Sequence, residues 1–346
     1  MADQHNGAAH WIDHVVVPTN DMGSWVAWAE NVIGVEHATI GGLTTAARRR
    51  NQPIATFLDI GDGSCHFGAF LQPEDLEASA GLGNDYPRYG FFVNAADLET
   101  HIQRLDEQGV AHSEPLASTS EGVDGVAVRF QDPDGNQWEF WAPEEMPAGA
   151  MDVATSLGVG RISSAVYGSR DLQRTAGFFE RYFGLQRAGS AGSAGIPEDT
   201  LVLPLEAGGR IVYHLTDGVD QRVTGHGPWF AMHAAFTVYD DQYMANYERL
   251  WAEVPEEAGT KESLGQDTPA EDAQPARTGL HGSPVGRKWK ELYERGDEIY
   301  DWDGHAFHFI GGVAVQPDGS LATYRPKEQA AYLEELIASI GDRKAP

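Results

Sequence analysis

Histidines in strand-like stretches are the residues of this chain whose type and spacing suit metal chemistry. His14, His214, His233 and His308 each lie in a run rich in β-branched or aromatic residues. A lone histidine on a strand is more often a polar core residue, whereas several converging imidazoles can bind Fe(II), Zn(II), Co(II), Ni(II) or Cu(II). Which of these side chains meet depends on the elements that carry them.

Motifs for two other kinds of chemistry are missing from the sequence. The glycine-rich segment 189–195 is not followed by the Gly-Lys-Ser/Thr of a phosphate-binding loop. No Ser/His/Asp order stands out as a hydrolase motif. The histidines therefore remain the main candidates for a functional site.

The composition is that of a globular protein with room for two domains. The chain has 346 residues, of which 41% are hydrophobic and 22% charged. Acidic residues outnumber basic ones by 52 to 24, which gives a formal net charge of -28. This charge disfavours nucleic acid and anionic membranes as partners.

Three further features of the sequence predict a cytoplasmic protein. The single cysteine, Cys65, excludes an internal disulfide and fits a reducing compartment. No apolar run approaches the roughly 20 residues needed to cross a bilayer. The first residues lack the basic and apolar regions of a signal peptide.

An internal repeat organises the chain. Residues 12–34 and 162–184 each read as a strand, an acidic N-cap, an amphipathic helix and a glycine C-cap. Residues 89–109 and 233–251 repeat the order of strand and helix. Strand-like runs and a glycine-containing hairpin follow each helix. The sequence therefore predicts an α+β fold of four βαβββ units, near 10–73, 87–143, 159–217 and 229–315.

Consecutive units are expected to pair into two domains. Units one and two would form a domain over residues 8–145, and units three and four a domain over residues 159–315. Residues 144–158 read as the linker between them. Residues 255–280 are acidic and lack periodicity, which predicts a flexible insertion in unit four. Residues 326–341 predict a terminal helix that packs on the fold or forms a dimer contact.

Two sequence motifs carry a resemblance to a known family. They are the segment Phe130–Trp141, FQDPDGNQWEFW, and the run Asp13–Val17, DHVVV. With the four units, they resemble the vicinal-oxygen-chelate superfamily, which includes glyoxalase I, extradiol dioxygenases, and fosfomycin and bleomycin resistance proteins. The resemblance implies two tandem, cupped open-barrel domains. It also implies that metal ligands come from inward positions on the first and last strand of each unit.

The resemblance implies a metal site in the second domain. The four inward positions there fall on Ser164, His214, His233 and His308. Three histidines among four positions predict a divalent metal, with Fe(II) first and Zn(II), Mn(II), Co(II), Ni(II) or Cu(II) as alternatives.

The same positions in the first domain are less suited to a metal. They fall on His14, on Gly68 or Ala69, on Arg88 and on Glu139. A cation at Arg88 would repel a divalent ion. We therefore expect a structural half in which Glu139 pairs with Arg88, while a second site with His14 stays open. His66 reads as nearby but out of register.

Two residues outside the predicted ligands are candidates for catalysis. His281 stands where extradiol enzymes often carry a second histidine, and a neutral imidazole there could act as a general base. The alternative is an exposed loop histidine. Tyr300 flanks the closing hairpin of unit four.

The first functional hypothesis is a metal-dependent dioxygenase, an oxidoreductase of aromatic-compound metabolism with a small phenolic or catecholic substrate. The second is a glyoxalase-type lyase or isomerase, in which Glu139 would act as a base or ligand. The third is a metal-free binding protein, which Arg88 and Ser164 would support. A homodimer is expected in each case, because cupped domains bury apolar faces by pairing.

Overall fold

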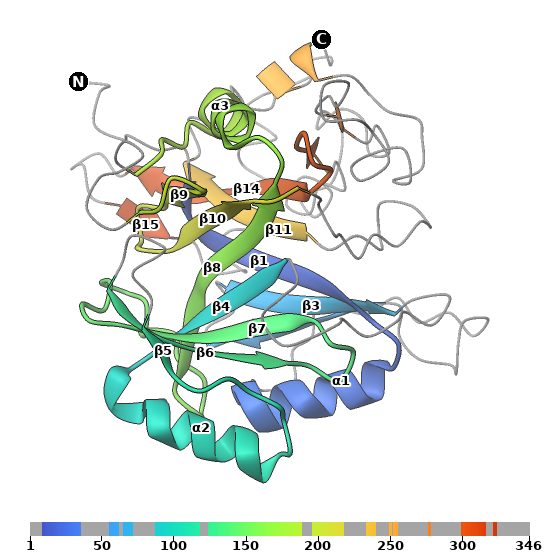
Figure 1. The fold of residues 1–346 in the computed structure, drawn as a ribbon, viewed down its shortest axis with the longest axis vertical. Coiled ribbons are helices and arrows are strands. Elements are labelled where there is room, and N and C mark those ends of the chain that lie inside the picture. Colours follow the sequence, from blue (N-terminus) through green and yellow to red (C-terminus); the bar gives the residue numbers. More distant parts are fainter. Residues whose placement is uncertain are drawn as a thin grey trace.

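The computed structural model describes most of the predicted elements (Figure 1). The residues described are 9–35, 55–61, 65–71, 87–117, 124–188, 196–217, 233–239, 249–250, 252–254, 276–277, 299–315 and 321–323. Most of the proposed insertion, the proposed terminal helix and His281 lie outside these ranges.

The first sheet has eight strands in the order β12-β13-β14-β11-β1-β3-β2, with β15 paired to β14. Its strands are β1 (Ala9–Thr19), β2 (Ala55–Ile60), β3 (Cys65–Leu71), β11 (His233–Tyr239), β12 (Ala276–Arg277), β13 (Ile299–Tyr300), β14 (Ala306–Val315) and β15 (Leu321–Thr323). The strands of units one and four therefore form one sheet.

The second sheet has seven strands in the order β5-β6-β7-β4-β8-β10-β9. Its strands are β4 (Arg88–Val93), β5 (Leu116–Ala117), β6 (Gly125–Gln131), β7 (Gln137–Pro143), β8 (Val159–Ser169), β9 (Thr200–Pro204) and β10 (Arg210–Leu215). This sheet joins the strands of units two and three. The α+β class and the cupped sheets expected from the sequence are confirmed.

The sheets correct the expected pairing of consecutive units. Strand β1 pairs antiparallel with β11, and β4 pairs antiparallel with β8, so the seams join units one to four and two to three. The segment predicted as a linker is partly buried, with Ala150 and Val153 packed into the protein. It positions unit three beside unit two instead of separating them. The proposed boundaries of separately folding domains stay a prediction.

The helices of units one, two and three begin and end where the sequence predicts, while most of the helix expected in unit four lies outside the described residues. They are α1 (Met22–Trp28) with a π-helical continuation η1 (Ala29–Ile33), the short η3 (Ala95–Asp97), α2 (Leu98–Glu107) and α3 (Leu172–Phe183). Asp21 caps α1 by accepting from the backbone of Ser24, and Asp171 caps α3 in the same way. Gly184 ends α3 with a positive φ of 66°, which favours glycine. No helix within the described ranges is long and apolar enough to span a membrane.

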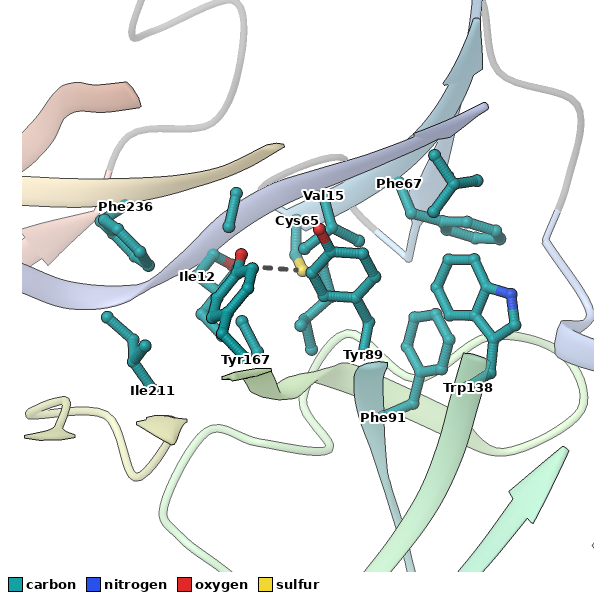
Figure 2. Packing of buried hydrophobic residues seen from close by; sticks show 14 of the residues in the cluster. Ile12, Val15, Cys65, Phe67, Tyr89, Phe91, Trp138, Tyr167, Ile211 and Phe236 are labelled. Atoms are coloured by element: carbon teal, nitrogen blue, oxygen red, sulfur yellow. Dashed lines mark hydrogen bonds between the residues drawn. The ribbon is translucent and has the colours of Figure 1, made fainter. Parts of the chain in front are cut away.

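One face of each sheet faces a shared hydrophobic core (Figure 2). Phe67 of the eight-stranded sheet contacts both Phe91 and Trp138 of the other, with ring centroids 5.4 and 5.6 Å apart. Tyr167 and Phe307 make a similar contact at 5.3 Å. Because side chains alternate along a strand, the core takes one face of each sheet and leaves the opposite face for other residues.

The two aspartate-containing hairpins tie consecutive units together. Asp134 of unit two accepts a hydrogen bond from Thr19 of unit one at 2.6 Å. Asp303 of unit four accepts one from Arg170 of unit three at 2.7 Å. Consecutive units are thus linked through their hairpins, while the sheets link units one to four and two to three.

Candidate metal centre

Four histidines occupy neighbouring positions on the eight-stranded sheet. In one cross-strand row, His66 on β3 pairs with His14 on β1, His14 pairs with Ala235 on β11, and Ala235 pairs with His308 on β14. His233 lies two residues before Ala235, on the same face of β11. These positions come from the first and last strands of units one and four.

His14 contacts the imidazoles of both His66 and His233 in a buried place. Nε2 of His14 lies 3.3 Å from Nε2 of His233. The ring of His14 stacks on that of His66, with centroids 4.7 Å apart. All three side chains are buried. His308 enters this description only through the register of its backbone.

Asp13 lies beside the histidines because β1 is irregular there. The pairing of β1 with β11 shifts between Ile12 and His14, which leaves Asp13 as an extra residue. An oxygen of Asp13 lies 2.8 Å from Nδ1 of His14 and 4.0 Å from Nε2 of His66. Asp13, His14 and His66 offer three ligand atoms within 4.8 Å of one another.

Burial keeps the imidazoles of His14 and His66 neutral. It lowers the pKa of His14 to about 3. It also lowers the pKa of His66 to about 3, and the neighbouring His14 acts in the same direction while Asp13 opposes it. Burial raises the pKa of Asp13, against the effects of His66, Thr237 and Arg161. Neutral imidazole is the form that binds a metal ion.

The separation of the His14 and His233 nitrogens, which is also a hydrogen-bonding distance, fits two ligands of one divalent metal. Two nitrogens at about 2.0–2.1 Å from a tetrahedral ion are separated by about 3.3–3.4 Å, which matches His14 and His233. Neither ring nitrogen of His66 has a hydrogen-bond partner among the described residues. Leaving such buried polar atoms unsatisfied costs about 1–3 kcal/mol. A metal ion would satisfy one of them.

An apolar wall stands next to the histidines on the same face. Val16, Phe57 and Phe70 pack together there. The ring of Phe57 meets His14 and His66 edge-on, with centroids 5.8 and 5.5 Å away. The face thus places apolar side chains directly beside the histidines.

The matching positions of the seven-stranded sheet hold different residues. Arg210 pairs with Ser164, Ser164 with Gly90, and Gly90 with Glu139. Arg88 lies two residues before Gly90, as His233 lies two before Ala235. The register therefore matches His66 with Arg210, His14 with Ser164, His233 with Arg88, and His308 with Glu139.

The seven-stranded face is occupied by ion pairs. Glu139 forms an ion pair with Arg88 at 3.2 Å and accepts a hydrogen bond from Arg129 at 3.4 Å, with Glu139 and Arg88 both buried. Arg210 stacks over Trp141, 4.4 Å from the ring centroid. The pairing of Glu139 with Arg88 follows the sequence prediction. Arginines on this face stand at the positions where the eight-stranded sheet has imidazoles, and their positive charge would repel a divalent ion.

The structure brings only part of the predicted trio together. His233 and His308 lie on the eight-stranded sheet. His214 lies on β10 in the seven-stranded sheet, with Nδ1 3.2 Å from the hydroxyl of Thr200. The predicted trio does not come together, because His214 lies four residues beyond Arg210, the counterpart of His66, and because units three and four do not share a sheet.

The two proposed catalytic residues are placed less fully. Tyr300 pairs with Ala306 on β14, which pairs with His233, so its backbone lies in the cross-strand row of His233. Its side chain and the whole of His281 lie outside the described residues.

Sequence reasoning set His66 aside as out of register and did not consider Asp13, while it left a second site with His14 open. A signal for His66 was present: Cys65, Phe67, Ala69 and Leu71 alternate along β3 and are all buried apolar residues. Their alternation places His66 on the opposite face. Asp13 could not be found in this way, because the irregularity of β1 breaks the alternation.

Comparison with known proteins supports the fold. Residues 11–140 match the Glyoxalase/Bleomycin resistance protein/Dioxygenase superfamily. A putative dioxygenase from Bacillus subtilis has a TM-score of 0.57 at 16% identity, over 88% of this chain and 86% of that one. Glyoxalase I from Zea mays has a TM-score of 0.50 at 15% identity, over 87% and 92%. At these identities, the likeness concerns the fold alone. None of the curated proteins compared matches the chain.

Proposed function

Because the chain has the fold of the Glyoxalase/Bleomycin resistance protein/Dioxygenase superfamily, we propose that it is a metal-dependent dioxygenase acting on a small phenolic or catecholic compound. His14, His66 and His233 would hold the ion, with His308 at the fourth position by register. The metal would be Fe(II) first, with Zn(II), Mn(II), Co(II), Ni(II) or Cu(II) as alternatives. The 3.3 Å approach of the His14 and His233 nitrogens carries this proposal.

A bound ion would supply a Lewis acid for neighbouring substrate oxygens. The side chains around the ion would determine which substrate binds to it. Three neutral imidazoles add no negative charge, so the ion keeps its full positive charge and favours an anionic chelating group such as a catecholate. The burial of His14, His66 and His233 limits the access of water.

The apolar wall supports an aromatic substrate. Phe57 and Phe70 stand beside the histidines and can contact the face or edge of a flat ring. A substrate whose oxygens point to the imidazoles would place its ring against these side chains. Tyr300 on the row of His233 is a candidate to contact the same substrate, and His281 stays a proposal from sequence alone.

The glyoxalase-type alternative depended on a carboxylate at Glu139. Glu139 lies on the seven-stranded sheet and is bound by Arg88 and Arg129. The metal-free alternative drew on Arg88 and Ser164, which also lie on that sheet. The residues that favoured the two alternatives thus lie on a different sheet from the histidines. We therefore favour the dioxygenase over both alternatives.

Metal analysis combined with oxygen uptake tests the proposal. We expect wild type to bind one equivalent of metal and to consume oxygen with a catechol, while His14→Ala and His233→Ala lose both. His214→Ala is the matched control and should keep both. If His14→Ala and His233→Ala retain metal, the site is wrong. If wild type holds metal but turns over a hemithioacetal under nitrogen, the lyase replaces the dioxygenase.

The proposal includes a cytoplasmic location and a homodimer. Cys65 forms no disulfide, and its buried thiol donates to the backbone oxygen of Ile12 at 3.6 Å, in keeping with a reducing compartment. The dimer is tested by light scattering of the purified protein, and a monomeric mass would remove it from the proposal without affecting the metal centre.

A further inference from the structure

We propose that Asp13 and Thr237 form a positioning pair that fixes the tautomer and orientation of His14, so that its Nε2 faces His233. This inference rests on the proposed metal centre for its purpose, but the pair itself is a property of the metal-free protein.

The contacts form a continuous chain of hydrogen bonds. Asp13 Oδ1 lies 2.8 Å from Nδ1 of His14, and Thr237 donates to Asp13 Oδ2 at 3.2 Å. Thr237 donates to Asp13, as it would to an ionised carboxylate, and an ionised Asp13 only accepts, so the proton of the His14 ring then belongs on Nδ1. Nε2 then presents a lone pair toward His233, 3.3 Å away. All four side chains are buried, so water does not compete for these bonds.

The irregularity in β1 makes the arrangement possible. In a regular strand, adjacent side chains point to opposite faces, and Asp13 could not reach the ring of His14 from the far side. The shifted register between Ile12 and His14 inserts Asp13 as an extra residue. The two neighbours can then share one face.

The seven-stranded sheet has the same irregularity without the same contacts. The pairing of β8 with β4 shifts between Ile162 and Ser164, which makes Ser163 the counterpart of Asp13. The hydroxyls of Ser163 and Ser164 have no hydrogen-bond partner among the described side chains and backbone. The bulge is therefore part of both sheets, while the carboxylate and imidazole occur together only in the half with the histidines.

The pair also joins the two units that build the site. Asp13 comes from unit one and Thr237 from unit four, on the two strands of the seam. The orientation of His14 is thus set by both sides of that seam. Residues that orient a ligating histidine in this way typically change metal affinity by about 10- to 100-fold when they are replaced.

Nitrogen-15 NMR of the metal-free protein tests the pair directly. We expect wild type to carry the His14 proton on Nδ1. Asp13→Asn should lose that preference and weaken Co(II) binding about 10- to 100-fold, with a smaller loss in Thr237→Val. Ser163→Ala, at the equivalent bulge, should change neither. Circular dichroism checks that each variant is folded.

The outcomes separate this inference from the proposed function. A wild-type His14 with its proton on Nε2 overturns the positioning pair without the need for any variant. Co(II) binding and a tautomer unchanged in Asp13→Asn also overturn it. If wild type shows the Nδ1 proton, lost in Asp13→Asn, but binds no Co(II), the pair stands and the proposed metal centre fails.

Discussion

The two sheets have matching backbone positions but carry side chains of different chemistry at them. At four matching positions, the eight-stranded sheet has His14, His66, His233 and His308, while the seven-stranded sheet has Ser164, Arg210, Arg88 and Glu139. The histidines can bind a metal ion, whereas Arg88 and Glu139 on the other sheet form an ion pair with each other. The fold therefore supplies the positions, and the side chains alone decide which of two similar faces can bind a metal.

The largest expected difference between the two faces is in metal content. His14→Ala and His233→Ala should reduce bound metal to background and oxygen uptake by about 10²- to 10³-fold, because each removes a ligand of the proposed ion. Ser164→Ala and His214→Ala, on the other sheet, should leave both unchanged. Elemental analysis and an oxygen electrode measure these effects. Equal metal loss in both pairs of variants would contradict the assignment of faces.

The seven-stranded face should instead matter for stability. Glu139→Gln leaves the buried Arg88 without its carboxylate and should lower the free energy of unfolding by about 3–5 kcal/mol, with metal content unchanged. Urea denaturation followed by circular dichroism measures the change. A stable variant that has lost its metal would transfer the site to this face.

Acid should destabilise the metal-free protein through the eight-stranded face. Burial holds the pKa of His14 and His66 at about 3, well below the unfolded value of about 6.5. Below pH 6.5 the unfolded chain gains protons that the native state does not, so stability is lost as the pH falls from 6.5 toward 3. From pH 7.5 to 5.5, the expected loss is about 1–3 kcal/mol.

A variant isolates this effect from other acidic groups. Asp132, whose pKa burial raises to about 6, contributes in the opposite direction. The pH dependence of wild type is therefore compared with that of His14→Asn/His66→Asn, which should lose less stability over the same range. Parallel curves for the two proteins would show that these imidazoles are not neutral in the native state.

The apolar wall should give the smallest effect. Phe57→Leu should raise KM for a catechol by about 3- to 10-fold with kcat little changed, because the ring loses part of its contact surface. Val202→Ala, at the matching position of the other sheet, is the control and should leave KM unaffected. Steady-state oxygen uptake measures both, and a change in kcat alone would place Phe57 elsewhere in the mechanism.

Local patterns in the sequence predicted much of the fold. The caps Asp21 and Asp171, the glycine at the end of α3 and the strands of each unit follow from short-range preferences. Which unit pairs with which did not follow from these short-range preferences. Which units pair depends on contacts between strands that are far apart in the sequence. Alternation and turn signals describe only local structure and do not encode these contacts.

That gap explains the errors in the predicted site. The inward positions that the sequence predicts for the first strands of units one and three, His14 and Ser164, hold matching places in the two sheets, but the sequence pairs consecutive units. His14 was then separated from His233, and His214 was assigned to a site on the other sheet. The pairing of Arg88 with Glu139 was predictable because both lie within unit two. His14 and His233 meet only across the seam between the first and fourth units.

The central claim is that units one and four bind one ion together. A crystal structure of the Co(II)-loaded protein, with the ion located by its anomalous scattering, tests it most directly. The account predicts one strong peak bonded to Nε2 of both His14 and His233, with none on the seven-stranded face. A peak at His214, or at Glu139 and Arg88, would contradict it.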